Sequence, residues 1–350
     1  MELASNKLDE AVALLAKACR TGDVRTASLL VRRGDLRLLQ NFGPVASEDP
    51  LFLIASVCKP MTAAGVMLLV DRGELALSDQ VCRFLPAFTG DGRDRITVKH
   101  LLTHTSGLPD MLPENDHLRK RHAPLDDFVT AACKTPLLFA PGAEVRYQSM
   151  GFLLAARIVE VVTGIQFRHF LRRELFTPLG MHQTSLGLGG CNLAQTEMCQ
   201  VPGNEDWNRN SQYWRDLGAP WGGALSTAED VGRFVKSFLH PAQGVLRLGT
   251  AAGMIVNQNA GLNIPWGLGW MVKPGAFGAQ CSARAFGHFG VTGTVAWGDP
   301  ETDLCCVLLT TKPVHPSRKG LLGRVCDLVA EWGTTPNASD ALISPSAVQR

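Results

Sequence analysis

The chain lacks the features that mark several large classes of protein. No run of eighteen apolar residues occurs in its 350 residues, so no membrane-spanning segment is expected. The net charge is only +2 with both signs interspersed, which argues against a nucleic-acid or anionic-membrane partner. Ten cysteines are present, yet none stands in a Cys-x-x-Cys pair, and no metal or other cofactor is expected.

The remaining composition favours a large globular protein. A hydrophobic content of 45% is enough for a large core, in one big domain or two intimate ones. Residues 1–20 place acidic side chains among apolar ones at helical spacing, so we expect an amphipathic first helix and not a signal peptide. Together with scattered, mostly buried thiols, this predicts a cytoplasmic location. The sequence predicts no oligomeric state.

Hydrophobic patterns predict strands at both ends of the chain and helices between them. A hairpin is expected at 27–31 and 36–39, and strands at 267–272, 283–289, 292–297 and 304–311. Helices are expected at 97–102, 125–134, 151–163, 167–176 and 321–332, and another from the capping box 226–229 to about 238. This predicts an α+β fold with a sheet region at 1–73 and 220–333. A helical inserted region would span 74–219 and a loose tail 334–350.

The apolar run from Met61 to Val70 predicts a buried central helix that ends at Gly73. Ser56 lies at its leading end, near free backbone N–H groups and the positive end of the helix dipole. Lys59 follows one turn later on the same face. Burial lowers the pKa of a lysine, so Lys59 could take a proton from the hydroxyl of Ser56. Taken alone, the spacing equally describes an N-cap serine followed by a surface lysine.

Two further stretches carry residues that suit the same chemistry. Tyr147, one of only two tyrosines, lies in a loop led by Pro and Gly, and a neighbouring lysine ammonium would ease its ionisation. The stretch 286–293 has too much glycine for an ordinary strand, unless another group approaches its backbone closely. An edge strand that lines a cleft would meet this condition. Each stretch alone also fits a structural tyrosine or a structural histidine.

Taken together, Ser56-x-x-Lys59, Tyr147-x-Ser149 and His288-x-Gly290 resemble the three motifs of the serine β-lactamase and penicillin-binding-protein superfamily. The resemblance is strongest to the class C β-lactamase-like branch, which includes the family VIII carboxylesterases. It runs over 10–332 and includes 96–108, 222–227 and 266–270. It implies the β-lactamase/DD-peptidase-like fold, in which helices flank an antiparallel sheet beside a mainly helical inserted subdomain.

The resemblance also implies the residue roles. Ser56 would be the nucleophile, and Lys59 and Tyr147 would share the proton transfers. The N–H groups of Ser56 and Val291 would form an oxyanion hole, and water activated by Tyr147 would release the acyl group. The region 185–223 has little periodicity but several aromatic residues, Trp221 among them, and is expected to form a wall of the substrate site.

Two departures from the family pattern bear on the substrate. Ser149 replaces the usual asparagine, and His288 replaces the lysine of Lys-Thr-Gly. Both changes point away from β-lactams and D-Ala-D-Ala peptides and are compatible with neutral esters that His288, Gly290 and Ser149 would contact. We therefore expect a serine hydrolase that cleaves small-molecule carboxylic esters through an acyl-Ser56 intermediate. The alternatives are a β-lactamase or D-Ala-D-Ala carboxypeptidase, an acyltransferase of the same fold, and a non-catalytic binding scaffold.

One histidine pair has the spacing of a zinc site. His100 and His104 lie four residues apart on a predicted helix, but Leu101 stands where the usual glutamate would be. No third ligand is evident, so this segment is expected to be structural.

Overall fold

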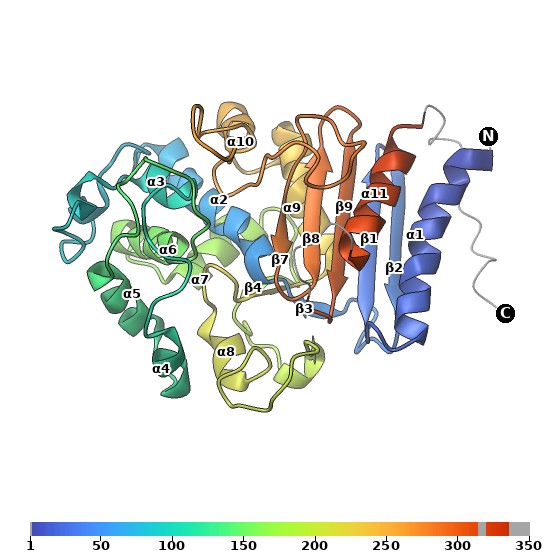
Figure 1. The fold of residues 1–350 in the computed structure, drawn as a ribbon, viewed down its shortest axis with the longest axis horizontal. Coiled ribbons are helices and arrows are strands. Elements are labelled where there is room, and N and C mark those ends of the chain that lie inside the picture. The colour runs from blue at the N-terminus through green and yellow to red at the C-terminus, as the bar shows by residue number, and fades with distance from the viewer. Residues whose placement is uncertain (1, 314–319, 336–350) are drawn as a thin grey trace.

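A five-stranded antiparallel sheet forms one half of the protein (Figure 1). The computed structural model describes residues 2–313 and 320–335. Both ends of the chain contribute strands to this sheet, as predicted. The strand order is β2-β1-β9-β8-β7, with β1 Ala27–Arg33, β2 Leu36–Phe42, β7 Phe286–Gly290, β8 Thr294–Asp299 and β9 Leu304–Thr310. This order leaves β7, the glycine-rich strand, at the edge.

Side chains alternate between two cores on the two faces of this sheet. In β9, Cys305 lies in the larger core and its neighbour Cys306 in the smaller one. Helices α1 (Glu2–Arg20) and α11 (Leu321–Gly333) cover the face of the smaller core. Helix α9 (Ala228–Leu239) covers the opposite face, which continues into the helical half.

The helical half surrounds α2, which spans Lys59–Arg72. Every residue of α2 from Lys59 to Leu69 is buried, and Gly73 ends the helix with a left-handed φ of 73°, as predicted. Although the predicted boundary at residue 73 groups α2 with the sheet, α2 packs against α6 and α7. The other helices here are α3 Val98–Leu102, α4 Asn115–Lys120, α5 Leu125–Lys134, α6 Met150–Thr163, α7 Phe167–Leu171, α8 Gln212–Leu217 and α10 Leu248–Met254.

Among the described residues, no single helix is long and apolar enough to cross a membrane. The bent pair Met150–Thr163 and Phe167–Phe176 meets that test together, by length and composition alone.

A second, four-stranded sheet was not predicted. Its order is β4-β6-β3-β5, from β3 Leu51–Leu53, β4 Ser185–Leu186, β5 Thr196–Glu197 and β6 Ala224–Ser226. Strands of two or three residues are too short to show an alternating pattern. The prediction of a strand at 267–272 was wrong, because Gly269 turns the chain at a φ of 79° and only isolated bridges form there.

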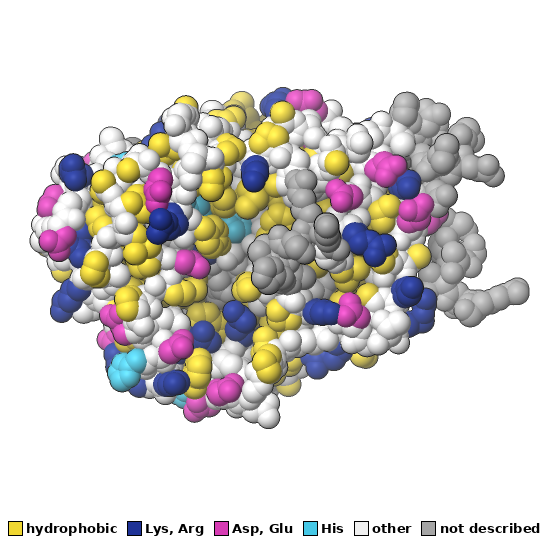
Figure 2. Space-filling view, in the orientation of Figure 1, with side chains coloured by type: hydrophobic (Ala, Val, Ile, Leu, Met, Phe, Trp, Pro, Cys, Tyr) yellow, Lys and Arg dark blue, Asp and Glu magenta, His cyan; other side chains and the backbone are white. Residues whose placement is uncertain are grey.

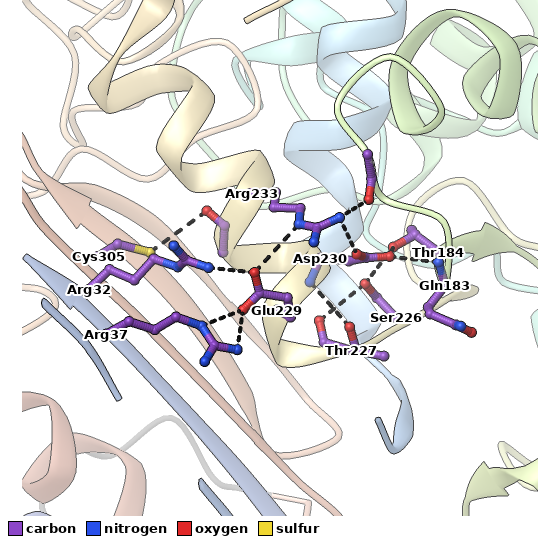
Figure 3. A network of polar contacts seen from close by, with 12 residues as sticks. Arg32, Arg37, Gln183, Thr184, Ser226, Thr227, Glu229, Asp230, Arg233 and Cys305 are labelled. Carbon is purple, nitrogen blue, oxygen red and sulfur yellow. Dashed lines mark hydrogen bonds and ion pairs between the residues drawn. The ribbon is translucent and has the colours of Figure 1, made fainter. Parts of the chain in front are cut away.

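The start of α9 also differs from the predicted capping box. Thr227, and not Ser226, is the N-cap and accepts a hydrogen bond from the backbone N–H of Asp230. Glu229 faces the sheet instead, where it pairs with Arg32 and Arg37, and it also pairs with Arg233 of its own helix (Figure 3). Asp230 accepts a 3.0 Å hydrogen bond from Thr184, which directly precedes β4. These contacts tie α9 to the strands of both sheets.

The predicted loose tail at 334–350 lies, beyond residue 335, outside the described residues.

Candidate active site

Both sheets hold the backbone that leads to Ser56. The N–H of Ile54 donates to the carbonyl of Ala224, while the hydroxyls of Thr292 and Thr294 donate to the carbonyls of Leu53 and Ile54 at 2.6 Å and 2.8 Å. Ala55 has a φ of 48°, an unfavourable left-handed conformation for alanine. These fixed neighbours stabilise a strained turn that presents Ser56.

Ser56 lies slightly ahead of the predicted helix start. It belongs to a 3-10 turn, Ala55–Cys58, that continues directly into α2 at Lys59. The prediction that Ser56 and Lys59 share a face is confirmed, because Lys59 Nζ lies 3.0 Å from Ser56 Oγ. Nζ also donates to the backbone carbonyl of Trp221 at 2.9 Å. These two contacts hold the Lys59 amine next to the Ser56 hydroxyl.

Burial sets the protonation of Lys59. The side chain has no exposed surface, and desolvation lowers its pKa from 10.5 to about 8, against weaker opposing effects of Asp110 and Cys58. The predicted direction is confirmed. An amine with this pKa is partly neutral near neutral pH and can accept the proton of Ser56.

Tyr147 completes the group at the other side of the hydroxyl. Lys59 Nζ lies 4.7 Å from the centroid of its ring. Desolvation raises the pKa of the Tyr147 phenol, while a hydrogen bond with the Ser56 hydroxyl opposes this rise. The expectation of an easily ionised phenol was wrong, because the effect of burial on the Tyr147 pKa dominates. Tyr147 therefore stays a phenol at neutral pH.

Three rings pack around Tyr147 and fix its orientation. The ring centroids of His104, His288 and Trp266 lie 4.7, 6.0 and 6.0 Å from its own. His104 is fully buried, and its Nδ1 accepts a hydrogen bond from the N–H of Gln148. This contact places the second motif against the stretch 96–108. His100 caps its own helix by accepting from the N–H of Thr97.

A cavity of about 930 Å³ opens above Ser56. Six of the predicted site residues line it: Ser56, Tyr147, Ser149, Trp221, Gly290 and Val291. The face in Figure 2 is hollowed near its middle, and dark blue Lys and Arg side chains gather below the hollow. Another cavity, of about 810 Å³, lies between α5, α6, α7 and α8 and contains none of the predicted site residues.

His288 does not line the cavity, contrary to its predicted substrate contact. It is only 2% exposed, because the rings of Tyr147 and Trp266 cover it. Burial and the nearby Lys59 lower its pKa to about 3, so the imidazole is neutral. The third motif therefore supplies no cation here.

The expected close approach to the glycine-rich strand is present at Gly290. A Cβ added to Gly290 would lie 2.5 Å from the carbonyl oxygen of Ile54 and 3.2 Å from the Cβ of Ala55. The group that comes so near is thus the turn that carries Ser56. Val291 follows at the cavity wall with 47% of its surface exposed. That the backbone N–H of Val291 forms half of an oxyanion hole remains a prediction.

Sequence reasoning missed Asp110. Ser149 Oγ donates a 2.6 Å hydrogen bond to its carboxylate, which is exposed to the cavity. Asp110 lies two residues beyond the family-like stretch 96–108, and that position was the available signal. Position 149, where the resemblance leads one to expect an asparagine, thus holds a hydroxyl bonded to a carboxylate.

Three cationic side chains of the cavity wall were also missed, Arg119, Arg209 and Lys273. They come from α4, from the loop before α8 and from the segment before β7. Nothing in their local sequence marks them, because only the fold brings them together.

The family model for the beta-lactamases matches residues 9–328 of this chain. Penicillin-binding protein 4 of Amycolatopsis lactamdurans is 31% identical over 275 residues, which cover 72% of this chain and 68% of that protein. Esterase EstB of Burkholderia gladioli is 36% identical over 194 residues, 51% of this chain and 47% of that protein. The latter match spans about half of the relative.

Solved structures show the same fold. A family VIII carboxylesterase superposes with a TM-score of 0.78 at 18% identity, over 94% of this chain and 98% of that one. EstCE1, described as a hydrolase with promiscuous acyltransferase activity, has a TM-score of 0.77 at 21% identity and covers 95% of this chain and 99% of its own. By its sequence and its α+β architecture, the chain belongs to the beta-lactamase family and has the fold of its serine hydrolases.

Proposed function

We propose that this protein is a carboxylesterase that acylates Ser56. One observation carries the proposal: the buried amine of Lys59 lies 3.0 Å from the Ser56 hydroxyl, beneath a cavity of about 930 Å³. A nucleophile, a base within hydrogen-bond reach and a group that orients the base are the parts that covalent catalysis requires. Here the carbonyl of Trp221 orients the base.

The acylation step follows from the protonation states. Neutral Lys59 takes the hydroxyl proton as Ser56 Oγ attacks the ester carbonyl carbon. The negative oxygen that forms would be stabilised by the N–H groups of Ser56 and Val291. The bond from the carbonyl carbon to the alcohol oxygen then breaks, and the Tyr147 phenol gives its proton to the leaving alkoxide. Lys59 ammonium returns a proton to Tyr147, so the proton balance closes.

Deacylation uses the same groups in reverse. A water molecule takes the place of the alcohol, and its proton passes through Tyr147 and Lys59 to the departing Ser56 oxygen. The acid is released and Ser56 is restored. An alcohol in place of this water would give acyl transfer.

Two features of the site support esters over β-lactams. His288 is neutral and buried, so the third motif offers no fixed charge to a β-lactam carboxylate. Asp110 adds a negative charge beside Ser149, where an amide would otherwise receive a peptide-like side chain. The match to esterase EstB agrees with this choice.

The test is a substrate panel with the purified protein and Ser56→Ala. We expect kcat/KM for p-nitrophenyl acetate and butanoate to exceed that for a chromogenic cephalosporin by at least about 10²-fold. Ser56→Ala should abolish ester cleavage. Preference for the cephalosporin would assign a β-lactamase instead, and equal ester cleavage by Ser56→Ala would remove the proposed nucleophile.

A further inference from the structure

We infer that the substrate carries an anionic group, a carboxylate or a phosphate, remote from its ester bond, and that Arg119 and Arg209 bind this group. The inference rests on the proposed ester cleavage at Ser56. Both arginines line the cavity that opens above Ser56.

Arg119 is held in place before any ligand binds. Its guanidinium carbon lies 4.1 Å from the ring centroid of Trp214 and 5.3 Å from that of Trp207. One terminal nitrogen donates a 2.7 Å hydrogen bond to the carbonyl of Trp207. A cation stacked on aromatic faces keeps a fixed orientation and loses little further entropy on binding.

The two guanidinium groups retain free donors. Arg119 Nε is buried without a hydrogen-bond partner, and the Arg209 side chain forms no hydrogen bond within residues 2–313 and 320–335. In the same part of the chain neither arginine forms an ion pair with a carboxylate. The Arg209 donors are therefore available to a ligand oxygen, and the second terminal nitrogen of Arg119 likewise has no hydrogen-bond partner among the described residues.

The positive charges of Arg119 and Arg209 also repel each other. Burial first and the charge of Arg209 second lower the pKa of Arg119, and Asp116 on α4 only partly opposes them. An anion between two guanidinium groups would remove this repulsion and accept bidentate hydrogen bonds. A carboxylate or phosphate offers two oxygens for such bidentate hydrogen bonds, whereas a halide does not.

An opposite charge on another part of the cavity wall gives the ligand its direction. Asp110 lies beside Ser149, next to the reacting groups, and it influences Lys59 and Tyr147 directly. An anionic group would be repelled there. The ester therefore lies near Asp110 and the anion near Arg119. A rigid substrate of suitable length, or a flexible chain, would reach both.

The first experiment compares matched esters at constant low ionic strength. p-Nitrophenyl hexanoate is compared with mono-p-nitrophenyl adipate, which places a carboxylate on the acyl chain. Phenyl acetate is compared with its 4-carboxy and 4-phosphate derivatives, which place the anion on the alcohol. We expect one anionic ester to exceed its neutral partner in kcat/KM by about tenfold or more, the effect of a charged hydrogen bond.

Variants then assign the effect to the arginines. Arg209→Gln and Arg119→Gln should each lower the anionic-to-neutral ratio by about tenfold. Arg209→Lys should restore part of the preference, because it restores the charge without the fork geometry. Arg121→Gln is the control. Arg121 lies next to α4 and pairs with Asp127 but does not line the cavity, so the ratio should stay unchanged.

A binding measurement separates this inference from the proposed function. Calorimetry with Ser56→Ala should show that the favoured anionic ester binds about tenfold or more tightly than its neutral partner, without turnover. Cleavage of neutral esters with a ratio near one, or a ratio equal in wild type and Arg209→Gln, would overturn the anion subsite and leave the esterase. Tighter anionic binding without cleavage of any ester would support the subsite and overturn the esterase.

Discussion

The backbone carbonyl of Trp221 lies 2.9 Å from Lys59 Nζ and holds the amine against the Ser56 hydroxyl. The carbonyl belongs to a segment that joins the helical region to β6, so the catalytic geometry depends on the contact between distant parts of the chain. Trp221 itself also lines the cavity, with its side chain almost fully buried. One residue thus orients the base and shapes the substrate site.

The first prediction concerns the pH dependence of ester cleavage. Lys59 must be neutral to accept a proton, and its pKa in the folded protein is about 8. We expect kcat/KM to rise with pH and level off above an apparent pKa near that value, since this parameter reports the free enzyme. The profile is measured with p-nitrophenyl acetate, corrected for spontaneous hydrolysis. A flat profile between pH 6 and about 9 would exclude Lys59 as the base.

Removal of the Asp110 charge should shift this profile. Asp110 raises the pKa of Lys59 by stabilising the ammonium. In Asp110→Asn the amine should lose its proton more easily, so the rising limb should move to lower pH. Ser149→Ala, which keeps the Asp110 charge, is the control and should move it less. A shift to higher pH in Asp110→Asn would contradict the electrostatic assignment.

Replacement of Lys59 should lower the activity and raise the stability of the protein. Burial of its ammonium lowers the pKa from 10.5 to about 8. Burial of the Lys59 ammonium therefore lowers the free energy of unfolding. This loss of stability is complete below the pKa of about 8 in the folded protein, and it vanishes as the pH rises to the ordinary pKa of 10.5. We expect Lys59→Met to raise the free energy of unfolding at pH 7 by about 1–3 kcal/mol and to lower kcat/KM by at least about 10²-fold.

Urea unfolding at several pH values tests the first half of this expectation. The stability advantage of Lys59→Met over wild type should shrink between pH 8 and 10.5. Lys17→Met, at an exposed position of α1, is the control and should change neither stability nor its pH dependence in this way. A Lys59→Met variant that is less stable at every pH would contradict the burial penalty.

Gly290 should tolerate no side chain. A Cβ there would meet Thr294 Oγ1 at 2.1 Å and the Ile54 carbonyl oxygen at 2.5 Å. We expect Gly290→Ala to push β7 away from the Ser56 turn, to lower kcat/KM by more than about tenfold and to cost about 1–3 kcal/mol of stability. Gly249→Ala on α10 has open space and should cost nothing. Equal behaviour of the two variants would show that the close approach is not needed.

Sequence patterns predicted the large sheet and the central helix because both depend on local regularities. The strands of the large sheet pair over up to seven residues, and α2 is apolar on every side. The small sheet escaped prediction because its strands have two or three residues. Glu229 has the spacing of a capping residue, yet the arginines of β1 and β2 bind it, and no local pattern reveals such a contact.

The candidate site divides in the same way. Ser56, Lys59 and Tyr147 stand in recognisable motifs, and the structure brings them together. Asp110 and Arg119 reach the cavity through tertiary contacts alone. The direction of the Tyr147 pKa was mistaken because a sequence reveals a neighbouring lysine more readily than the depth of burial. Electrostatics at the site requires coordinates, whereas the candidate nucleophile can be proposed from its motif alone.

The most direct measurement of the central claim is the mass of the protein after reaction with a fluorophosphonate. The account predicts one adduct, located by peptide mapping on Ser56, with loss of esterase activity in step with labelling. Ser56→Ala should remain unlabelled, and Lys59→Met should label at least about 10²-fold more slowly. An adduct on another residue, or an unlabelled wild-type protein that still cleaves esters, would contradict Ser56 as the nucleophile.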